Sequence, residues 1–509
     1  MQTSYHDVHH RLHNADDVAL ERIVEVLEAD RAAAAQLTPE PATTDAPSTM
    51  PRDERFARST GLFVPTYALW ERDRPLPSFR HLHDLARIAR SQDIDVVSTL
   101  PLYATFLGEP FDPSPYSPIS RLHWNEVYLD DAELPDAPVP ELGDHVDWRE
   151  LAARRRAQLV EAARMVDDDR QAALDAFVAE HPDVAEYARF RAMTEAPGDK
   201  VVERSHVLAQ YLADRQLQEI TDDPDAAALA LDLPIGSHPD GFETWRYPEL
   251  FASEMSVGAP PDAFFADGQD WGFPPPLPAM GRASEQRLWR DLVARVGRHT
   301  EVLRIDHAMA VERLWWVPEG LPAHQGAYVH YPREDIIAVI AGAALDAGVT
   351  IVGENLGTVP AEVSEAFERW DVLGMYEEQF HLDDDPLPHI PWRTVAGIRT
   401  HDMAPLAEAV RDLDTDGYRQ RVGAAHHEVV ADTWQDVLRH MLLRLSSSDA
   451  FMVVVDLDDL LGELRPHNLP GRVVPEIWRR RLDRPTSETL ADPDVRRRLE
   501  LLRRGRRPI

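Results

Sequence analysis

Short hydrophobic runs alternate with longer segments of helical spacing from about Gly61 to the C-terminal region. This alternation predicts repeated strand and helix units. Eight runs have the length of buried strands, and eight is the strand count of a (β/α)8 TIM barrel, so we predict this α/β fold. The sixth run, LGMYEEQF, is weak as a strand and is assigned by the count. The runs span residues 60–69, 94–105, 228–237, 301–307, 349–357, 373–380, 395–402 and 450–459.

Two intervals between the predicted strands are longer than a single crossover helix requires. After the second strand, a charged helical segment at about 131–205 predicts a helical subdomain. After the third strand, residues 238–300 are rich in Pro, Gly and aromatic residues, which predicts a system of active-site loops. Residues 1–58 are expected to form one helix, over about 15–36, and a flexible linker. The catalytic barrel is assigned to residues 59–509.

Charge and composition narrow the classes of partner. The chain has 89 acidic and 53 basic side chains and a net charge of -36, which disfavours nucleic acid as a partner. It has no cysteine, which excludes disulfides, thiolate chemistry and cysteine-held zinc. No apolar run approaches the length of a membrane span, and the first residues do not resemble a signal peptide. We therefore expect a cytoplasmic protein with no membrane partner.

Three acidic residues lie at or just beyond the ends of predicted strands: Asp306, Glu354 and Asp402. A carboxylate at the C-terminal end of a barrel strand is costly unless it is paired or takes part in chemistry. Structural pairing with an arginine is an equal alternative for any one of them. Three acids at corresponding positions favour chemistry at the mouth of the barrel.

A pair of carboxyl groups about 5 to 5.5 Å apart suits a double displacement at a sugar carbon, with one nucleophile and one acid/base. Arg304 precedes Asp306 by two residues and therefore lies on the same face of a strand. A guanidinium in that position is expected to keep a nucleophilic Asp306 ionised at neutral pH.

Several segments together resemble one enzyme family. The segments LRIDH, GENLG and THD resemble the catalytic segments of the amylomaltases, or 4-α-glucanotransferases, of glycoside hydrolase family 77 in the α-amylase clan. Colinear matches extend this resemblance over roughly residues 59–485, and their order is more specific than any one motif. They include SPYSPISRLHWNEVYLD, QYLADRQL, DLPIGSHPDGFETWRYPELF, GAPPDAFFADGQDWGFP, RPHNLPG and WRRRL.

The resemblance implies a role for each matching residue. Asp306 would be the nucleophile, Glu354 the general acid/base and Asp402 the stabiliser of the transition state. The remaining matches would bind substrate: Arg304, His401, Asp240 and Tyr116 at or near the sugar in the −1 subsite, and Gln269 and Trp271 on the acceptor side.

The implied reaction transfers an α-1,4-glucan segment between maltooligosaccharides through a covalent glycosyl-enzyme, with no cofactor and no metal. Transfer requires that an acceptor sugar, not water, reaches the intermediate. Phe264, Phe265 and Trp271 would supply apolar surface for that purpose.

The chain departs from the typical family pattern beside the acids. It has GENLG where Ala-Glu-Asp-Leu-Gly is typical, THDMAP where Thr-His-Asp-Asn-Asp is typical, and WGFPPPLP after the acceptor loop. These changes bear on substrate length, acceptor choice and the ratio of transfer to hydrolysis. Three alternatives stay open: a hydrolase on the same scaffold, a non-catalytic glucan-binding barrel, and a metal-dependent hydrolase that uses His307, His401 and the acids. Trp315 and Trp316 lie in a segment expected to lead into a helix, and we expect at least one of them to be a packing residue.

Overall fold

The protein is described here from a computed structural model. The described residues are 1–6, 12–36, 47–140, 143–261, 265–279, 282–357, 359–382, 384, 387–411, 433–469 and 476–506.

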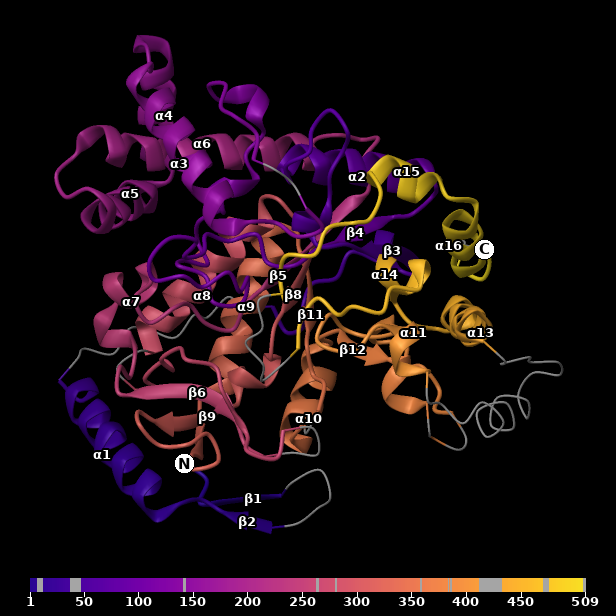
Figure 1. Cartoon of the computed structure of the whole chain (residues 1–509). Coiled ribbons are helices and arrows are strands. Elements are labelled where there is room, and N and C mark those ends of the chain that lie inside the picture. The colour runs from indigo at the N-terminus through magenta and orange to yellow at the C-terminus, as the bar shows by residue number, and fades with distance from the viewer. Residues whose placement is uncertain are drawn as a thin grey trace.

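Eight parallel strands form the central sheet (Figure 1). A parallel bridge between Val352 and Leu373 joins its two end strands and closes the barrel. The predicted (β/α)8 barrel is therefore confirmed, and each predicted run overlaps one strand. In chain order the strands are β3 (Ser59–Phe63), β4 (Val96–Ser98), β5 (Ala228–Leu233), β8 (Val302–Ile305), β11 (Thr350–Gly353), β12 (Gly374–Glu377), β13 (Thr394–Gly397) and β14 (Met452–Asp456).

Helices surround these strands, as Figure 1 shows. Their ends follow ordinary capping chemistry: Gly348 closes one helix in the left-handed conformation, and Thr433 forms a capping box with Asp436. The helices between and after the strands are α2 (Phe79–Ser91), α6 (Lys200–Thr221), α8 (Arg282–Gly297), α9 (Arg333–Ala347), α10 (Ala361–Trp370), α11 (Leu406–Ala409), α13 (Trp434–Ser447), α14 (Leu457–Leu461), α15 (Thr486–Ala491) and α16 (Pro493–Arg503).

The inside of the barrel changes character along the strands. Val302 and Met375 belong to a buried apolar cluster within the barrel. Two residues further along the same strands, the side chains on the same face belong to Arg304 and Glu377. The barrel therefore has an apolar floor and a charged layer at its carboxyl end, where the active site of such a barrel forms.

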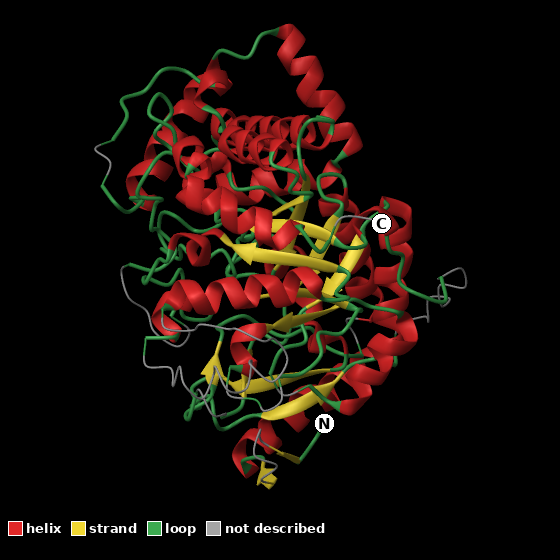
Figure 2. Cartoon of the chain, turned by 90° about the vertical axis from the view of Figure 1, so that its right-hand side faces the viewer, coloured by secondary structure: helices red, strands yellow, loops and turns green. Residues whose placement is uncertain are grey.

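Four helices occupy the interval between β4 and β5 that we interpret as a helical subdomain. They are α3 (Trp148–Arg164), α4 (Asp168–Glu180), α5 (Pro182–Glu195) and α6. Three of them begin at an aspartate, Asp147, Asp167 or Asp199, whose side chain accepts a backbone N–H of the first turn. These helices lie at one end of the molecule, beyond the barrel strands (Figure 2).

A second, antiparallel sheet of four strands has the order β10-β9-β6-β7. It lies outside the barrel and combines part of the 238–300 interval with the segment after β8. That interval also contains α7 (Phe242–Arg246) and α8, so it is not composed only of loops. The strands are β6 (Met255–Ala259), β7 (Gln269–Asp270), β9 (Arg313–Pro318) and β10 (Ala327–His330).

Trp315 and Trp316 belong to β9 and not to the approach to a helix, which corrects our expectation for this segment. Both side chains are almost completely buried, so the expected packing role is confirmed. The alternation of apolar residues is too short in this segment to distinguish a strand from a helix start.

The N-terminal part contains the expected helix, α1 (Asp17–Ala34), which begins where Asp16 accepts two backbone N–H groups. A hairpin that we did not predict precedes it, formed by β1 (Ser4–His6) and β2 (Leu12–Asn14). Part of the expected linker, residues 37–46, lies outside the described residues.

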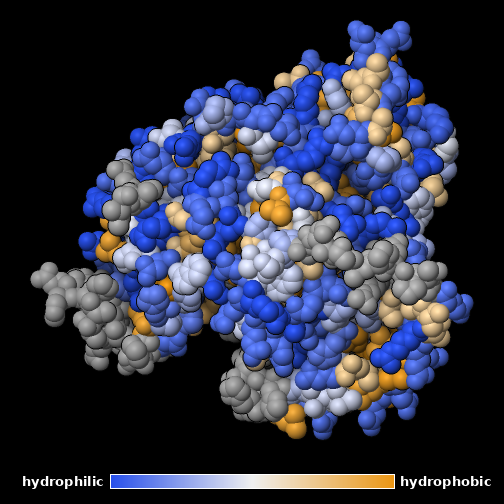
Figure 3. All heavy atoms as spheres, turned by 180° about the vertical axis from the view of Figure 1, so that it is seen from behind, coloured by the Kyte–Doolittle hydropathy of each residue, from blue (hydrophilic) through white to orange (hydrophobic). Residues whose placement is uncertain are grey.

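The surface seen in Figure 3 is mainly hydrophilic, with hydrophobic residues in small separate groups. Along the described ranges, no helix combines the length and the apolar character that crossing a bilayer requires.

Candidate active site

The three predicted acids meet at the carboxyl end of the barrel. Asp306 follows β8, Glu354 follows β11, and Asp402 lies on the loop after β13. They interact electrostatically, because the charges of Glu354 and Asp402 both raise the pKa of Asp306. Asp306 and Asp402 therefore act on one another in the same site, although they are 402 − 306 = 96 positions apart in sequence.

Arg304 binds two carboxylates at once. Its Nη1 donates to Asp306 Oδ1 at 2.9 Å and also contacts both oxygens of Asp232, at 2.7 and 2.8 Å. The Asp306 backbone N–H donates to the carbonyl of Leu233, next to Asp232, at 3.0 Å. The contact between Arg304 and Asp306 that the spacing predicts is present, but Asp232 shares the guanidinium.

The expectation that Arg304 alone keeps Asp306 ionised at neutral pH is not met, because other groups act against it. Burial raises the pKa of Asp306 to about 7, and the charges of Asp232, Glu354 and Asp402 add to this effect against the opposing Arg304. One cation does not compensate for lost hydration and neighbouring acids together. Asp306 is therefore poised to titrate near neutral pH.

Glu354 is held by the backbone. Its Oε2 accepts the His307 N–H at 2.9 Å, and its Oε1 accepts the Leu356 N–H at 2.7 Å. His307 has a positive φ of 43°, a strained conformation for a residue with a side chain. This turn directs the N–H of the residue after Asp306 toward Glu354, so it couples the positions of the two carboxyl groups.

Asp402 is the most accessible of the mouth carboxylates. Its side chain is 46% exposed, against 21% for Asp306 and 5% for Asp232, so Asp402 and Asp306 can reach a ligand. Its Oδ1 accepts from Asn468 Nδ2 at 2.6 Å and lies 3.3 Å from His401 Nε2. Removal from water raises the pKa of Asp402, but His401 and Asn468 outweigh it and lower that pKa to about 2.

Tyr116 and His401 form the aromatic wall of the mouth. Their rings stack with centroids 4.9 Å apart and planes within 13°. The Tyr116 hydroxyl donates to Asp232 Oδ2 at 2.6 Å, which orients the ring. Both predicted residues therefore lie beside the carboxylates.

Asp240 is not part of this cluster. It lies on the loop beyond β5, its side chain is 77% exposed, and its backbone N–H donates to His238 Nδ1 at 3.0 Å. The acid that contacts Arg304 and Tyr116 is Asp232, which we did not select from the sequence. The signal was available, because Asp232 stands within the buried strand run ALALDL, where an unused acid is costly.

Gln269 and Trp271 lie on the antiparallel sheet, at and just after β7. The Trp271 ring meets the His307 ring edge-on at 5.0 Å and stacks with Phe273 at 6.1 Å. Trp271 therefore contacts the residue that follows Asp306 in the chain. Phe264 lies outside the described residues.

Glu377 is a buried acid of the mouth that the sequence analysis did not select. It lies beside Gly397 in the register of β12 and β13, is 3% exposed, and its Oε2 approaches the space above that glycine. Burial raises the pKa of Glu377 to about 8, despite the charges of Arg304 and Arg399. The sixth predicted strand, residues 373–380, contains both Glu377 and Glu378. These two acids interrupt its apolar residues, which explains why its strand pattern is weak.

Two departures from the family pattern have local structural partners. Asn355 Oδ1 accepts the Met375 N–H at 2.8 Å and so ties the end of β11 to β12. The carbonyls of Met403 and Ala404 accept from Arg399 and Gln379. These residues therefore hold the loops that carry the acids.

Within the described ranges, the group of acids and histidines close enough to share a metal is Asp456, Asp458 and His467. Arginines already pair with it: Arg399 Nη2 lies 2.8 Å from Asp456, and Arg480 contacts Asp458. This arrangement is that of a buried ion-pair network. His307 and His401 do not belong to the group, so nothing in its geometry favours the metal-dependent alternative.

Comparisons with known proteins agree on one family. The family profile described as 4-alpha-glucanotransferase, glycoside hydrolase family 77, matches residues 64–204 and 199–487. A 4-alpha-glucanotransferase of Mycobacterium tuberculosis is 29% identical over 506 residues, covering 81% of this chain and 70% of the relative. One of Haemophilus influenzae is 30% identical over 302 residues, covering 52% of this chain and 43% of the relative.

Two solved structures share the fold. The amylomaltase of Corynebacterium glutamicum has a TM-score of 0.80 at 20% identity, covering 90% of this chain and 77% of its own. The amylomaltase of Streptococcus agalactiae in complex with acarbose has a TM-score of 0.77 at 20% identity, covering 88% of this chain and 99% of its own.

Proposed function

This chain belongs to the 4-alpha-glucanotransferases of glycoside hydrolase family 77, and we propose that it moves α-1,4-glucan segments between maltooligosaccharides with Asp306, Glu354 and Asp402 as its catalytic acids. The observation that carries the assignment of roles is the backbone link at His307. It couples Glu354 to the residue after Asp306, so that a nucleophile and an acid/base face one mouth.

In the first half of the reaction, an Asp306 oxygen attacks the anomeric carbon while Glu354 donates its proton to the glycosidic oxygen. The C–O bond breaks, the reducing-end fragment leaves as an alcohol, and the donor segment remains as an ester on Asp306. The raised pKa of Asp306 makes its carboxylate more basic than an ordinary aspartate, while Arg304 holds the attacking side chain in place.

In the second half, the 4-hydroxyl of an acceptor attacks the same carbon, Glu354 takes its proton, and the ester to Asp306 breaks. Two inversions give net retention. Asp402, ionised and accessible, accepts hydrogen bonds from sugar hydroxyls as the transition state forms. Asp232 orients Arg304 and Tyr116 and replaces Asp240 in our assignment.

Transfer requires that the acceptor site exclude water from the intermediate. Trp271 and Phe273 favour transfer over hydrolysis, because they present stacked aromatic surface next to His307, close to the nucleophile. A hydrolase on the same scaffold has no need for such a surface.

The products formed from maltotriose test the proposal. A transferase gives glucose together with maltooligosaccharides longer than maltotriose. Formation of only shorter sugars would indicate the hydrolase, and no turnover of this or longer α-1,4-glucans would indicate a binding barrel.

A further inference from the structure

The hairpin β1–β2 and helix α1 precede residue 64, where the family match begins. They nevertheless pack on the antiparallel sheet that carries the predicted acceptor residues, where α1 contacts β9 and β10, and Figure 1 shows α1 along this side of the molecule. We name residues 1–6 and 12–34 the N-terminal brace. We name the four-stranded sheet together with residues 271–279 the acceptor sheet.

The hairpin end of the brace binds the outer strands of the acceptor sheet. The Gln2 N–H donates to the Tyr328 carbonyl at 2.8 Å, so the chain start adds a bridge to β10. The Tyr5 ring is buried edge-on against Trp315 and Tyr328, with centroids 5.1 and 6.0 Å apart. Arg313 of β9 donates to the Gln2 side chain at 2.9 Å.

The helix end of the brace binds the segment that follows Trp271. Asp30, 4% exposed, accepts the Ala279 N–H on its Oδ2 at 2.8 Å. Arg22 donates to the Glu319 carbonyl beyond β9 at 2.8 Å, and Ile23 and Leu27 are buried in the main core. A buried carboxylate that accepts a backbone N–H holds that segment against the helix.

Contacts from β9 and β6 extend this hold to Trp271. Trp316 Nε1 donates to the Tyr331 hydroxyl at 3.0 Å, which donates to the Pro276 carbonyl at 2.8 Å. The Trp271 N–H donates to the Val257 carbonyl of β6 at 2.9 Å, and β6 pairs with β9. Trp315 and Trp316 therefore connect the brace to β6, which binds Trp271, and to Pro276 of the acceptor sheet.

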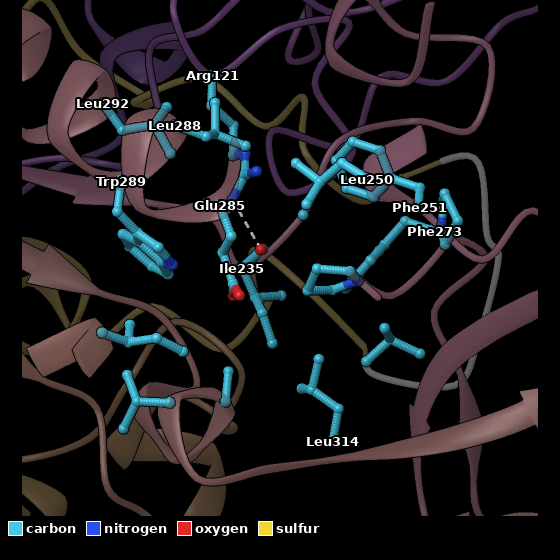
Figure 4. A pocket seen from close by; sticks show the side chains of 17 residues that line it. Arg121, Ile235, Leu250, Phe251, Phe273, Glu285, Leu288, Trp289, Leu292 and Leu314 are labelled. Atoms are coloured by element: carbon cyan, nitrogen blue, oxygen red, sulfur yellow. Dashed lines mark hydrogen bonds between the residues drawn. The ribbon is translucent and has the colours of Figure 1, made fainter. Parts of the chain in front are cut away.

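On its inner side the acceptor sheet faces a cavity of about 40 Å³ lined mainly by apolar side chains (Figure 4). Phe273 and Leu250 line one side and Trp289 of α8 the other, with Glu285 and Arg121 between them. Arg121 Nη1 donates to the Ile235 carbonyl at 2.8 Å, which the dashed line marks. Packing between the acceptor sheet and the barrel therefore leaves a void at this place, and the contacts on the outer side hold the sheet in addition to the core contacts.

We propose that the N-terminal brace is a positioning element of the acceptor site, with Asp30 and Tyr5 as its positioning residues, and that it determines how well an acceptor sugar competes with water. This inference rests on the proposed function, because it places acceptor binding at Trp271. A displacement of the acceptor sheet does not break the hydrogen bonds that hold Asp306, Arg304 and Glu354, since the partners in those bonds lie on the barrel strands and the turns that follow them. It changes only the half of the reaction that uses the acceptor.

The test uses the full-length chain with three variants of α1. Asp30→Ala removes the acceptor of the Ala279 N–H, Asp30→Asn keeps an oxygen in that place, and Glu28→Ala removes an exposed acid of the same helix. Each variant is assayed for the Michaelis constant of an acceptor such as glucose, for the ratio of transfer to hydrolysis, and for the rate of the first half-reaction measured with an activated donor.

We expect Asp30→Ala to raise the acceptor Michaelis constant about tenfold and to increase the hydrolysed fraction, since small misplacements at a reacting site have large effects. The first half-reaction should stay within about twofold. Asp30→Asn should recover most of the acceptor affinity, and Glu28→Ala should behave as the parent. Tyr5→Ala removes the Tyr5 ring that packs against Trp315, and it should raise the acceptor Michaelis constant less than Asp30→Ala does. This second variant keeps the test informative if Asp30→Ala fails to fold.

Equal loss in both half-reactions, or unchanged acceptor binding in Asp30→Ala and Tyr5→Ala, would overturn the inference. Failure of the proposed function has a different signature. In that case the parent protein itself forms no longer maltooligosaccharides from maltotriose.

Discussion

The sides of the mouth that we assign to the donor and to the acceptor are built in opposite ways. The donor side consists of charged residues at strand ends, fixed by short hydrogen bonds within the barrel, such as those from Arg304 to Asp232 and Asp306. The acceptor side is an added sheet above a cavity, fixed by aromatic packing and by an N-terminal segment. The donor side should therefore respond to changes of charge, and the acceptor side to changes of shape and support.

The largest effect should come from the donor-side acids. Asp306→Asn removes the proposed nucleophile and Glu354→Gln removes the proton of the proposed acid/base, so each should lower the rate of transfer on maltotriose on the order of 10³-fold or more. Product analysis measures the rate, and thermal unfolding verifies that the fold is intact. Near-normal transfer by either variant would exclude the assigned role.

A smaller effect should follow when the shared guanidinium is altered. Asp232 raises the pKa of Asp306 and Arg304 lowers it. Asp232→Asn should therefore move the acidic limb of kcat/KM to lower pH, and Arg304→Gln should move it to higher pH. Both variants should also lose activity, about 10²-fold for Arg304→Gln, because a preorganised charge is lost.

For Asp232→Asn and Arg304→Gln, the result that decides is the direction in which the acidic limb of kcat/KM moves. Shifts of the same sign would show that Arg304 and Asp232 do not act on the ionisation of one nucleophile. Thermal unfolding should accompany the pH profiles, since breaking a buried ion pair also destabilises the fold.

On the acceptor side, Trp271→Ala should raise the hydrolysed fraction about tenfold while the first half-reaction changes little, because the apolar surface beside His307 is lost. Trp392→Ala is a matched control, since Trp392 precedes β13 at the opposite end of the barrel strands. Sugar chromatography with water and glucose as competing acceptors measures the ratio. A proportional loss of both activities in Trp271→Ala would remove Trp271 from the acceptor site.

The smallest expected effect concerns the pH dependence of stability. It comes from one buried acid on each side, Glu377 at the mouth and Glu285 beside the cavity. Burial raises the pKa of Glu377 at the mouth and of Glu285 beside the cavity to about 8 each. Stability from such groups is present below the ordinary carboxyl pKa and is lost as pH rises through the folded pKa. The melting temperature should therefore fall between about pH 5 and 8.

Glu377→Gln or Glu285→Gln should each flatten this fall by about 2–5 °C, because glutamine does not ionise. An exposed acid such as Glu28 serves as the control, and Glu28→Gln should leave the pH dependence unchanged. If both buried variants keep the full fall, other groups are responsible for it.

The sequence was sufficient where the signal is local. The eight strands follow from short apolar runs, and Asp306, Glu354 and Asp402 follow from acids placed at the ends of those runs. The link between Arg304 and Asp306 follows from a spacing of two residues within one strand.

Properties that arise from distant contacts were not predictable. The pKa of Asp306 depends on burial and on Asp232, 74 residues earlier by the difference between 306 and 232. Asp240 was selected instead of Asp232, because sequence does not show which acid of that segment points into the barrel. The contact of Asp30 with Ala279 spans 249 residues, and no local pattern specifies such a pairing.

The most direct test of the central claim is to trap the glycosyl-enzyme. The Glu354→Gln variant, incubated with a 5-fluoro-α-glucosyl fluoride, should accumulate an adduct because its second half-reaction lacks the base. Mass spectrometry of the digested protein should find one added sugar on the peptide that contains Asp306, and no adduct in the Asp306→Asn control. An adduct on any other residue, or equal labelling of the Asp306→Asn protein, would contradict the assignment of the nucleophile.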